Sequence, residues 1–368
     1  MTDAASLEHL RGAAAPRNHN ARTIAALTAN PGCSRRAVMD AAGIDKERLA
    51  SYVGFPARFG QSQFAITRGN AFEAQLKANG CAELLALLRD VLKLPMPEAS
   101  YDDLESVDHL DARHARSRQL LARAAEGDED AGTLFDHPLL RLEVGGRWVY
   151  LEPDLIALRS GGKFYVVEIK SFAVIDGQAD GAKVSGAATQ AAVYVLALRR
   201  LLSDAGHDPA LVSHDVVLVC PENFSNRPIA TLIDVRKKLS VLERQLTRME
   251  RVDEIVATLS PDLTFDLAVD DAGVPQRPVS DLVDGLGQID ARYSPECLAN
   301  CELSFFCRHE AHGTTAALGR SVREELGGVS SVALALSLAS CAVEPAEDQA
   351  EAAAMLRLAA RLRAECLA

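Results

Sequence analysis

The sequence lacks any long uninterrupted hydrophobic run. Its longest apolar stretch, Val332–Val343, is broken by serine and is shorter than the ~20 residues that a membrane-spanning helix needs. The opening residues, MTDAASLEHLRGAAAP, also lack the apolar core of a secretory signal. We therefore expect a cytoplasmic protein with no membrane partner.

The sequence also lacks an excess of positive charge. It has 39 Lys and Arg against 51 Asp and Glu, which gives a formal net charge of -12. This balance excludes a protein that coats DNA through its overall charge, so any nucleic-acid contact must use local basic patches. The length of 368 residues allows two domains or one large one, and 48% hydrophobic with 24% charged residues is typical of a globular chain.

The turn-bounded segment from Trp148 to Lys170 contains the most informative motif. Two apolar runs flank Gly161–Gly162, which predicts a β-hairpin. Because side chains alternate along a strand, Glu168 and Lys170 point to the same face, which Asp154 can approach from the partner strand. Two carboxylates and one amine are costly there unless a partner neutralises them, and a hard divalent cation does this well. An ion pair on the sheet surface is the alternative.

These residues carry a family resemblance. Pro153–Asp154 followed by Glu168-Ile169-Lys170 resembles the signature of the PD-(D/E)xK nucleases. The resemblance implies that Asp154 and Glu168 hold Mg²⁺ or Mn²⁺, and that Lys170 orients or activates the attacking water.

A second segment resembles the same family. Thr67–Lys93 is expected to be one long helix, and its opening, RGNAFE, resembles the first core helix of these nucleases. The resemblance implies that Glu73 adds a carboxylate to the metal site and that Arg68 contacts nucleic acid. Alternatively, Glu73 is a solvated residue of the first turn, where the helix dipole favours a negative charge.

A third segment follows the hairpin. The helix expected at 187–203 carries Gln190 and Tyr194 four residues apart, and therefore on one face. This QxxxY pattern resembles the RecB-like branch of the superfamily, and implies that both side chains help to place the nucleic-acid strand beside the metals.

The eight cysteines are expected to be thiols or metal ligands rather than disulfides, as is usual in a cytosolic chain. Cys297, Cys301 and Cys307 lie close together and suit metal ligation, but they are one short of a Cys₄ set for an iron–sulfur cluster. With His309 they would instead form a local zinc site. The remaining cysteines are expected to be apolar fillers: Cys81, Cys220, Cys341 and Cys366.

The cysteine spacing resembles the iron–sulfur subset of RecB-like nucleases, which includes the CRISPR-associated Cas exonucleases. The resemblance implies that Cys33, upstream of the first core helix, completes a [4Fe–4S] ligand set with Cys297, Cys301 and Cys307. The chain departs from these relatives in the first gap, which has three residues, 298–300, where they usually have two. This departure keeps Zn²⁺ open as the alternative.

Residues 23–53 allow a competing interpretation. They have the helix, glycine turn and helix rhythm of a helix-turn-helix, with Arg35 and Arg36 available for DNA. On this interpretation the protein is a catalytically silent DNA-binding or scaffold protein with a nuclease fold.

The order of expected elements predicts an α/β fold with a mixed sheet. The resemblance implies a restriction-endonuclease-like core of helix, three strands, helix and strand, with helical additions at both ends; Ile229–Leu259 is expected to be a long charged helix. The expected organisation is an N-terminal helical segment with the first cluster cysteine at 1–66, a nuclease core at 67–260 with a charged insertion near 95–136, a cysteine segment at 261–310 and a helical appendage at 311–368.

Together these features predict a Mg²⁺- or Mn²⁺-dependent deoxyribonuclease, with an exonuclease as the expected form. Its expected substrate is DNA that is single-stranded or has a free end, and its C-terminal helices are expected to bind a protein partner. Antiviral defence and DNA repair both employ enzymes of this family.

Overall fold

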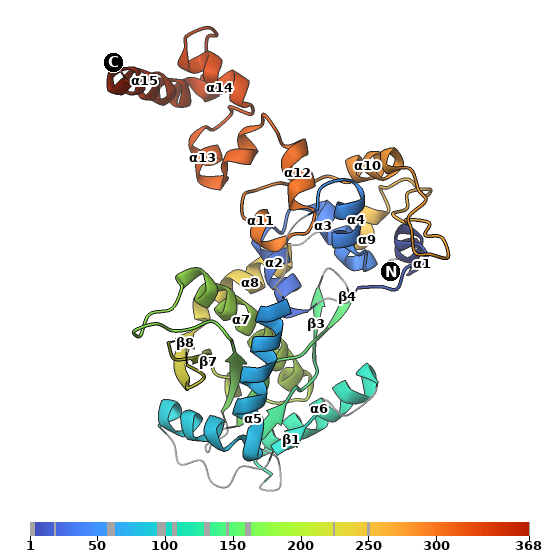
Figure 1. The fold of residues 1–368 in the computed structure, drawn as a ribbon, viewed down its shortest axis with the longest axis vertical. Helices are drawn as coiled ribbons and strands as arrows, with labels where there is room; N and C mark the ends of the chain where they lie inside the picture. Colours follow the sequence, from blue (N-terminus) through green and yellow to red (C-terminus); the bar gives the residue numbers. More distant parts are fainter. Residues whose placement is uncertain are drawn as a thin grey trace. The chain divides into compact units, whose positions relative to one another are not determined.

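The computed structural model consists of two compact units, which are described separately (Figure 1). Unit 1 comprises Met1–Pro16, Gly32–Phe59 and Asp253–Ala368, and unit 2 comprises Arg17–Pro31 and Gly60–Val252. Within the chain, the structure describes residues 4–17, 20–56, 63–93, 101–104, 109–128, 133–144, 147–158, 163–223, 225–248 and 251–367. The predicted turn glycines, Gly161 and Gly162, lie outside these residues.

Unit 2 is organised around a six-stranded mixed sheet with the order β1-β2-β5-β6-β7-β8. The pairs β1–β2 and β6–β7 are parallel, and the other three pairs are antiparallel. The strands are β1 (Tyr101–Asp103), β2 (Leu134–Asp136), β5 (Leu155–Leu158), β6 (Phe164–Ile169), β7 (Asp215–Pro221) and β8 (Pro228–Asp234). The β5–β6 hairpin predicted from the sequence is confirmed by this pairing.

A separate two-stranded sheet precedes β5. It consists of β3 (Leu140–Val144) and β4 (Arg147–Leu151), which pair antiparallel. Alternate residues of β3 are buried, so the hairpin packs one face on the core and exposes the other. Trp148 lies on the exposed face with the guanidinium of Arg141 4.4 Å from its ring centroid.

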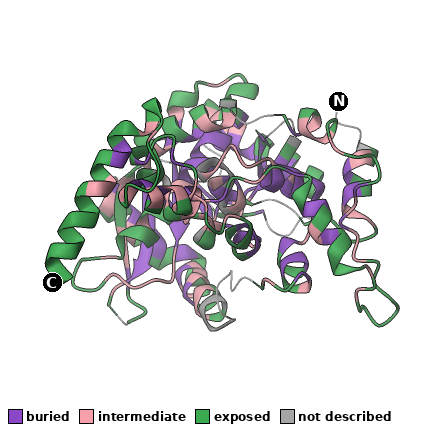
Figure 2. Cartoon of the chain, turned by 90° about the horizontal axis from the view of Figure 1, so that it is seen from above, coloured by how far each residue is buried: buried purple, intermediate pink, exposed green. Residues whose placement is uncertain are grey.

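Helices cover both faces of the large sheet. The apolar stripe of α5 (Gln63–Leu92) packs on the face formed by residues such as Leu155 and Val167. The other face packs against α7 (Gly181–Asp204), which connects β6 to the parallel strand β7. Figure 2 shows the buried strands and the inner faces of these helices in purple. The remaining helices of unit 2 are α2 (Ala21–Ala29), α6 (Leu110–Glu126), the short η1 (Pro209–Leu211) and α8 (Arg236–Arg248).

The helix expected at Thr67–Lys93 is interrupted. Ala78 has an extended conformation, and Asn79, Gly80 and Cys81 have φ values of 52°, 65° and 60°. Asn and Gly tolerate this left-handed region better than other residues, so the Asn79–Gly80 pair permits the break. The single long helix was therefore a wrong prediction, although the first half still presents Glu73.

The helix expected at Ile229–Leu259 was also predicted wrongly. Its first residues form β8, whose residues 228–234 pair with β7 along its whole length. Among the described residues of this range, α8 and α9 (Val252–Val256) are helical. Antiparallel pairing of β8 covers the edge of β7, and this long-range pairing outweighs the local helical pattern.

Unit 1 is helical. In its N-terminal part, α3 (Ser34–Ala42) ends at Gly43, whose φ of 68° forms a left-handed cap, and α4 (Lys46–Tyr52) follows after Asp45 caps its first turn. The helix, glycine turn and helix expected here are thus present. Its other helices are α1 (Ala4–Arg11), α10 (Val279–Gly287), α11 (Cys297–Asn300), α12 (Ser304–Glu310), η2 (Thr315–Leu318), α13 (Arg320–Glu325), α14 (Val332–Ala339), η3 (Glu347–Gln349) and α15 (Ala350–Leu367).

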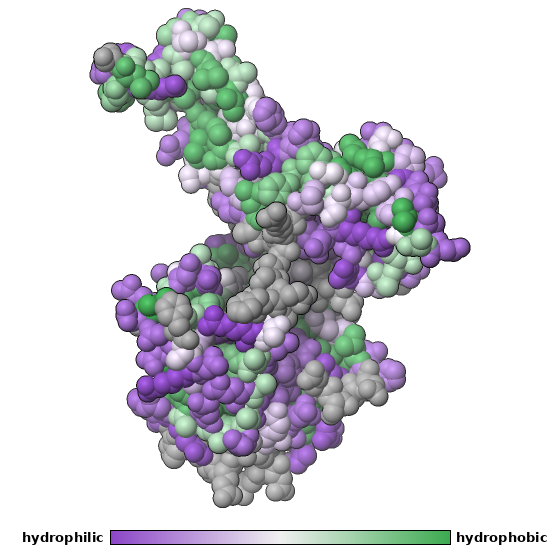
Figure 3. Space-filling model, in the orientation of Figure 1, coloured by the Kyte–Doolittle hydropathy of each residue, from purple (hydrophilic) through white to green (hydrophobic). Residues whose placement is uncertain are grey.

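The C-terminal helices have a small core of their own and expose apolar side chains. Leu338, Ala352 and Ala353 are buried between α14 and α15. Leu336 and Leu362 are more than half exposed, and Figure 3 shows apolar surface over this segment. The predicted protein partner of these helices stays a prediction.

The predicted mixed α/β class is confirmed. The sheet strands β2, β5 and β6 follow α5, and α7 and β7 follow them, so the expected element order occurs with extra elements inserted. The restriction-endonuclease-like core and the sequence-based domain boundaries stay predictions. No helix among the described residues is long and apolar enough to cross a membrane.

The sheet core gives a stability prediction. Phe164 is fully buried in β6, so Phe164→Ala should lower the free energy of unfolding of unit 2 by ~3–5 kcal/mol. The control, Leu232→Ala, truncates an exposed β8 side chain and should cost less than ~1 kcal/mol. Urea unfolding followed by the fluorescence of Trp148, the single tryptophan, measures both. Equal losses in the two variants would contradict this description of the core.

Candidate metal and active site

Strand register places the predicted acidic residues side by side. In the β5–β6 pair Leu155 lies opposite Val167, so continuing the register by one residue places Asp154 opposite Glu168. Directly opposed residues of antiparallel strands have Cα atoms ~4.5–5.5 Å apart and point to the same face. The Asp154 carboxylate also accepts a hydrogen bond of 2.7 Å from the backbone N–H of Ile169. The two carboxylates are therefore held together by the backbone of the hairpin.

Glu168 is the most deeply buried of these charged groups. Its side chain is fully buried, and its Oε2 has no hydrogen-bond partner among the described residues. Lys170 forms an ion pair with one of the oxygens. A buried carboxylate with unused acceptor capacity is costly, so these oxygens fit the coordination of a hard cation.

The electrostatics of the pair agree with this interpretation. Burial raises the pKa of Glu168 to about 8, and the neighbouring charge of Asp154 adds to the effect. Burial also raises the pKa of Asp154. Burial disfavours the charge on Lys170, but Glu168 and Asp154 outweigh it and raise its pKa. Two carboxylates with raised pKa values beside one ammonium are short of positive charge, which a divalent cation would supply.

The face of α7 that carries Gln190 and Tyr194 is directed at the same place. The Gln190 side-chain amide donates to the Tyr194 hydroxyl at 3.2 Å, as their spacing of four residues allows. Tyr194 is almost fully buried, and burial together with the charges of Glu168 and Asp154 raises its pKa well above the ordinary value. Tyr194 therefore stays protonated and can donate a hydrogen bond beside the carboxylates.

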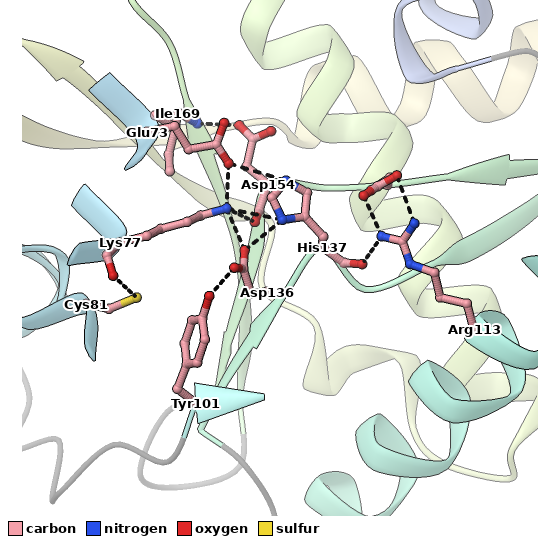
Figure 4. Close-up of polar contacts among 10 residues, drawn as sticks. Glu73, Lys77, Cys81, Tyr101, Arg113, Asp136, His137, Asp154 and Ile169 are labelled. Carbon is pink, nitrogen blue, oxygen red and sulfur yellow. Dashed lines mark hydrogen bonds and ion pairs between the residues drawn. The ribbon is translucent and has the colours of Figure 1, made fainter. Parts of the chain in front are cut away.

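Glu73 reaches the site from α5 but is already paired. Its Oε1 lies 2.5 Å from Nζ of Lys77 and 3.3 Å from Nε2 of His137 (Figure 4). Its ligand oxygens do not join those of Asp154 and Glu168 in a group within 4.8 Å among the described residues. The structure thus brings Asp154, Glu168 and Lys170 together and places Glu73 beside them in a separate network.

This network closes through Asp136. Lys77 Nζ lies 2.5 Å from Asp136 Oδ1, and His137 Nδ1 lies 3.0 Å from the same oxygen. The Tyr101 hydroxyl donates to the other Asp136 oxygen. Burial opposes these charges, but the contacts with Asp136 and Glu73 raise the pKa of His137 to about 10. The contacts with His137 and Lys77 correspondingly lower the pKa of Asp136 to about 2.

The predicted cluster cysteines all belong to unit 1. Cys33 precedes α3, Cys297 begins α11, Cys301 follows it, and Cys307 lies in α12. Cys33 and Cys301 both act electrostatically on Cys307, so these thiols are neighbours. All eight cysteines are free thiols. Cys341 and Cys366 were predicted to be apolar fillers, but both are exposed, so that prediction was wrong for these two.

Buried cations surround these thiols. Burial raises the pKa of Cys307 to about 12, while Arg35, whose guanidinium donates to its sulfur at 3.3 Å, opposes the shift. Burial raises the pKa of Cys301 to about 11, with Arg36 and Lys46 opposing it. Cations beside buried thiols favour the thiolate form that a metal requires.

The same burial changes the interpretation of the two arginines. Arg35 and Arg36 are 3% and 4% exposed, and they pair with Glu310 and Asp40 respectively. A guanidinium enclosed in this way does not present its donors to a phosphate backbone. Their burial therefore conflicts with the predicted contact with DNA, and with the helix-turn-helix hypothesis that depends on it. Arg68 is partly buried in α5, and its contact with nucleic acid stays a prediction.

One further group could hold a cation. Among the described residues, the ligand atoms of His214, Asp215 and Asp234 lie within 4.8 Å of one another, where β7 begins and β8 ends. The guanidinium of Arg236 already contacts both Asp234 oxygens, at 3.0 and 2.9 Å. This group is partly exposed, and it is separate from both the Asp154–Glu168 pair and the network of Glu73.

Several residues of the site were not predicted from the sequence. Lys77 lies one turn after Glu73, so its helical spacing of four residues could have indicated an ion pair. Asp136 ends β2 and His137 follows it, beside the active-site hairpin. Their alignment depends on a strand pairing that local pattern does not reveal. The sequence likewise gave no signal for Tyr101.

Comparison with known proteins gives limited similarity. No family model matches the chain, and no curated protein matches it. Among solved structures, SSO0001 is 13% identical with a TM-score of 0.27, and the match covers 66% of this chain and 82% of that one. A candidate exonuclease from Eubacterium rectale is 14% identical with a TM-score of 0.31, and the match covers 65% and 82%. TM-scores of this size do not establish a common fold, so a function can be inferred only from the geometry of the site.

The raised pKa of Glu168 predicts a pH dependence of stability in EDTA. Between pH ~4.3 and about 8 the native carboxyl keeps a proton that the unfolded chain has lost, so stability falls as pH rises through this window. Glu168→Gln removes this effect. From pH 5 to pH 9 the wild type should therefore lose ~4 kcal/mol relative to the variant, measured by urea unfolding at each pH. Exposed Glu143→Gln is the control, and parallel pH profiles for wild type and Glu168→Gln would contradict the assignment.

Proposed function

We propose that the protein is a nuclease that hydrolyses phosphodiester bonds with the help of a divalent cation, Mg²⁺ or Mn²⁺, held by Asp154 and Glu168. The observation that supports it is the fully buried Glu168 carboxylate, which has unused acceptor capacity and lies opposite Asp154. Both carboxylates prefer to be neutralised, and oxygen ligands of this kind are those that hard cations take. A divalent cation there would polarise the scissile phosphate and offset charge on the leaving oxygen.

The chain's own residues have separate roles in this proposal. Lys170 carries a positive charge at the edge of the pair and can orient a water or a phosphate oxygen by donating hydrogen bonds. Tyr194, kept protonated, donates beside the carboxylates, and Gln190 fixes its hydroxyl. Arg68, one to two turns before Glu73 on α5, is the proposed contact for the nucleic-acid backbone.

The proposed substrate is DNA that is single-stranded or has a free end, and exonuclease action in genome defence or repair is the proposed context. The support for this finer assignment is the set of motifs around Asp154, Glu168 and Gln190, which resemble RecB-like nucleases.

For unit 1 we propose that Cys33, Cys297, Cys301 and Cys307 hold a [4Fe–4S] cluster. The support is the proximity of the thiols in unit 1, where Cys33 and Cys301 both act electrostatically on Cys307. A single Zn²⁺ is the alternative. His309, the alternative zinc ligand, is exposed and stacks on Phe55 with ring centroids 5.0 Å apart.

The nuclease proposal predicts the behaviour of active-site variants. Asp154→Asn, Glu168→Gln and Lys170→Met should each lower the rate of DNA hydrolysis in Mn²⁺ by ~10²-fold or more, because each removes a charge at the reacting phosphate. Labelled single- and double-stranded DNA, with free and blocked ends, serve as substrates. Asp234→Asn is the matched control, since it alters the other acidic group and should retain wild-type activity. An active Asp154→Asn variant, or a wild type inactive on every substrate, would contradict the proposal.

The cluster proposal has its own test. Anaerobically purified protein should be brown and contain iron and sulfide, and Cys33→Ser should lose both. Cys366→Ser changes an exposed thiol and should keep them. A colourless protein that contains stoichiometric zinc would overturn the iron–sulfur assignment and leave the nuclease proposal in place.

A further inference from the structure

The ammonium group of Lys77 occupies the centre of a cage of ligand atoms. Its Nζ lies 2.5 Å from a carboxylate oxygen of Glu73 and 2.5 Å from one of Asp136. It also lies 3.4 Å from the backbone carbonyl oxygen of Asp154 and 3.2 Å from Nδ1 of His137 (Figure 4). Carboxylates and a backbone carbonyl are the donors that metal sites in proteins use for hard divalent ions. Here they surround an amine that belongs to the protein.

The network is already neutral without any bound ion. Glu73 and Asp136 supply two negative charges, and Lys77 and His137 supply two positive charges, each cation contacting both carboxylates. The neighbouring group of Asp154, Glu168 and Lys170 carries a formal charge of minus one. A second divalent ion would therefore enter a region whose negative charge is already neutralised. The free-energy cost of removing its hydration shell would be offset by little electrostatic attraction there.

We propose that Lys77 takes the place of a second metal ion, so that the active site binds a single divalent cation, between Asp154 and Glu168. This inference rests on the proposed function, because it concerns the cation of the same site. Glu73 is then a positioning residue that holds Lys77, rather than the direct metal ligand expected from the sequence. A fixed ammonium next to the Asp154 backbone would supply positive charge that two-metal nucleases obtain from their second ion.

The surroundings keep Lys77 in this position. Asp136 is anchored from its other oxygen by the Tyr101 hydroxyl, and His137 donates its backbone N–H to the Asp154 carbonyl oxygen at 3.4 Å. Lys77 itself is largely buried, with 12% of its side chain exposed. The ammonium therefore cannot swing out to solvent without breaking its ion pairs with Glu73 and Asp136 in a largely buried site, which is costly.

The test is the number of Mn²⁺ ions bound at this site. Equilibrium dialysis of EDTA-stripped protein against Mn²⁺ should give one ion per chain when Asp234→Asn is used as the common background, because that change removes the other acidic group. In this background Glu73→Gln should still bind one ion, whereas Asp154→Asn should bind none. Lys77→Ala frees two carboxylates and should bind two. Lys77→Arg keeps the positive charge and should bind one.

The outcomes separate the two proposals. Two ions in the unmodified site, one of which is lost in Glu73→Gln, would overturn the inference about Lys77 and leave the nuclease proposal standing. Mn²⁺ binding that is unaffected by Asp154→Asn would overturn the metal site itself, whatever Lys77 does. If Lys77→Ala proves unfolded by circular dichroism, the wild-type and Glu73→Gln stoichiometries decide the inference without it.

Discussion

The structure of the candidate site depends on one unfavourable arrangement, the enclosure of the Glu168 carboxylate inside unit 2 next to a second carboxylate. The β5–β6 register places Asp154 opposite Glu168, and the hydrogen bond from Ile169 keeps it there. One ammonium, that of Lys170, faces both negative charges. Holding two carboxylates side by side in a buried place lowers the stability of the fold. The same arrangement is well suited to binding a cation.

On the side of α5, next to this pair, the carboxylates are instead matched by an equal number of cations. Glu73 and Asp136 are matched by Lys77 and His137, and Tyr101 completes the network. The contrast between a charge-deficient pair and a neutral network of four groups explains why a divalent cation is expected at one position and not at the other. In unit 1, burial raises the pKa of the thiols of Cys301 and Cys307, and the neighbouring cations Arg35, Arg36 and Lys46 offset part of that rise.

The sequence predicted those parts of the site that depend on local spacing. Glu168 and Lys170 share a strand face because side chains alternate, and Gln190 contacts Tyr194 because a helix turns every 3.6 residues. Lys77 and His137 act through the packing of α5 on β2, which joins segments about sixty residues apart. No local pattern encodes that contact. Strand β8 was mistaken for helix for the same reason, since its pairing with β7 decides its conformation.

The central claim is that Asp154 and Glu168 bind a divalent cation. Crystals soaked in Mn²⁺, with anomalous scattering data collected at the manganese absorption edge, test this claim most directly. We expect one strong anomalous peak within coordination distance of the carboxylates of Asp154 and Glu168. A map with no peak there, or with manganese only at His214, Asp215 and Asp234, would contradict it.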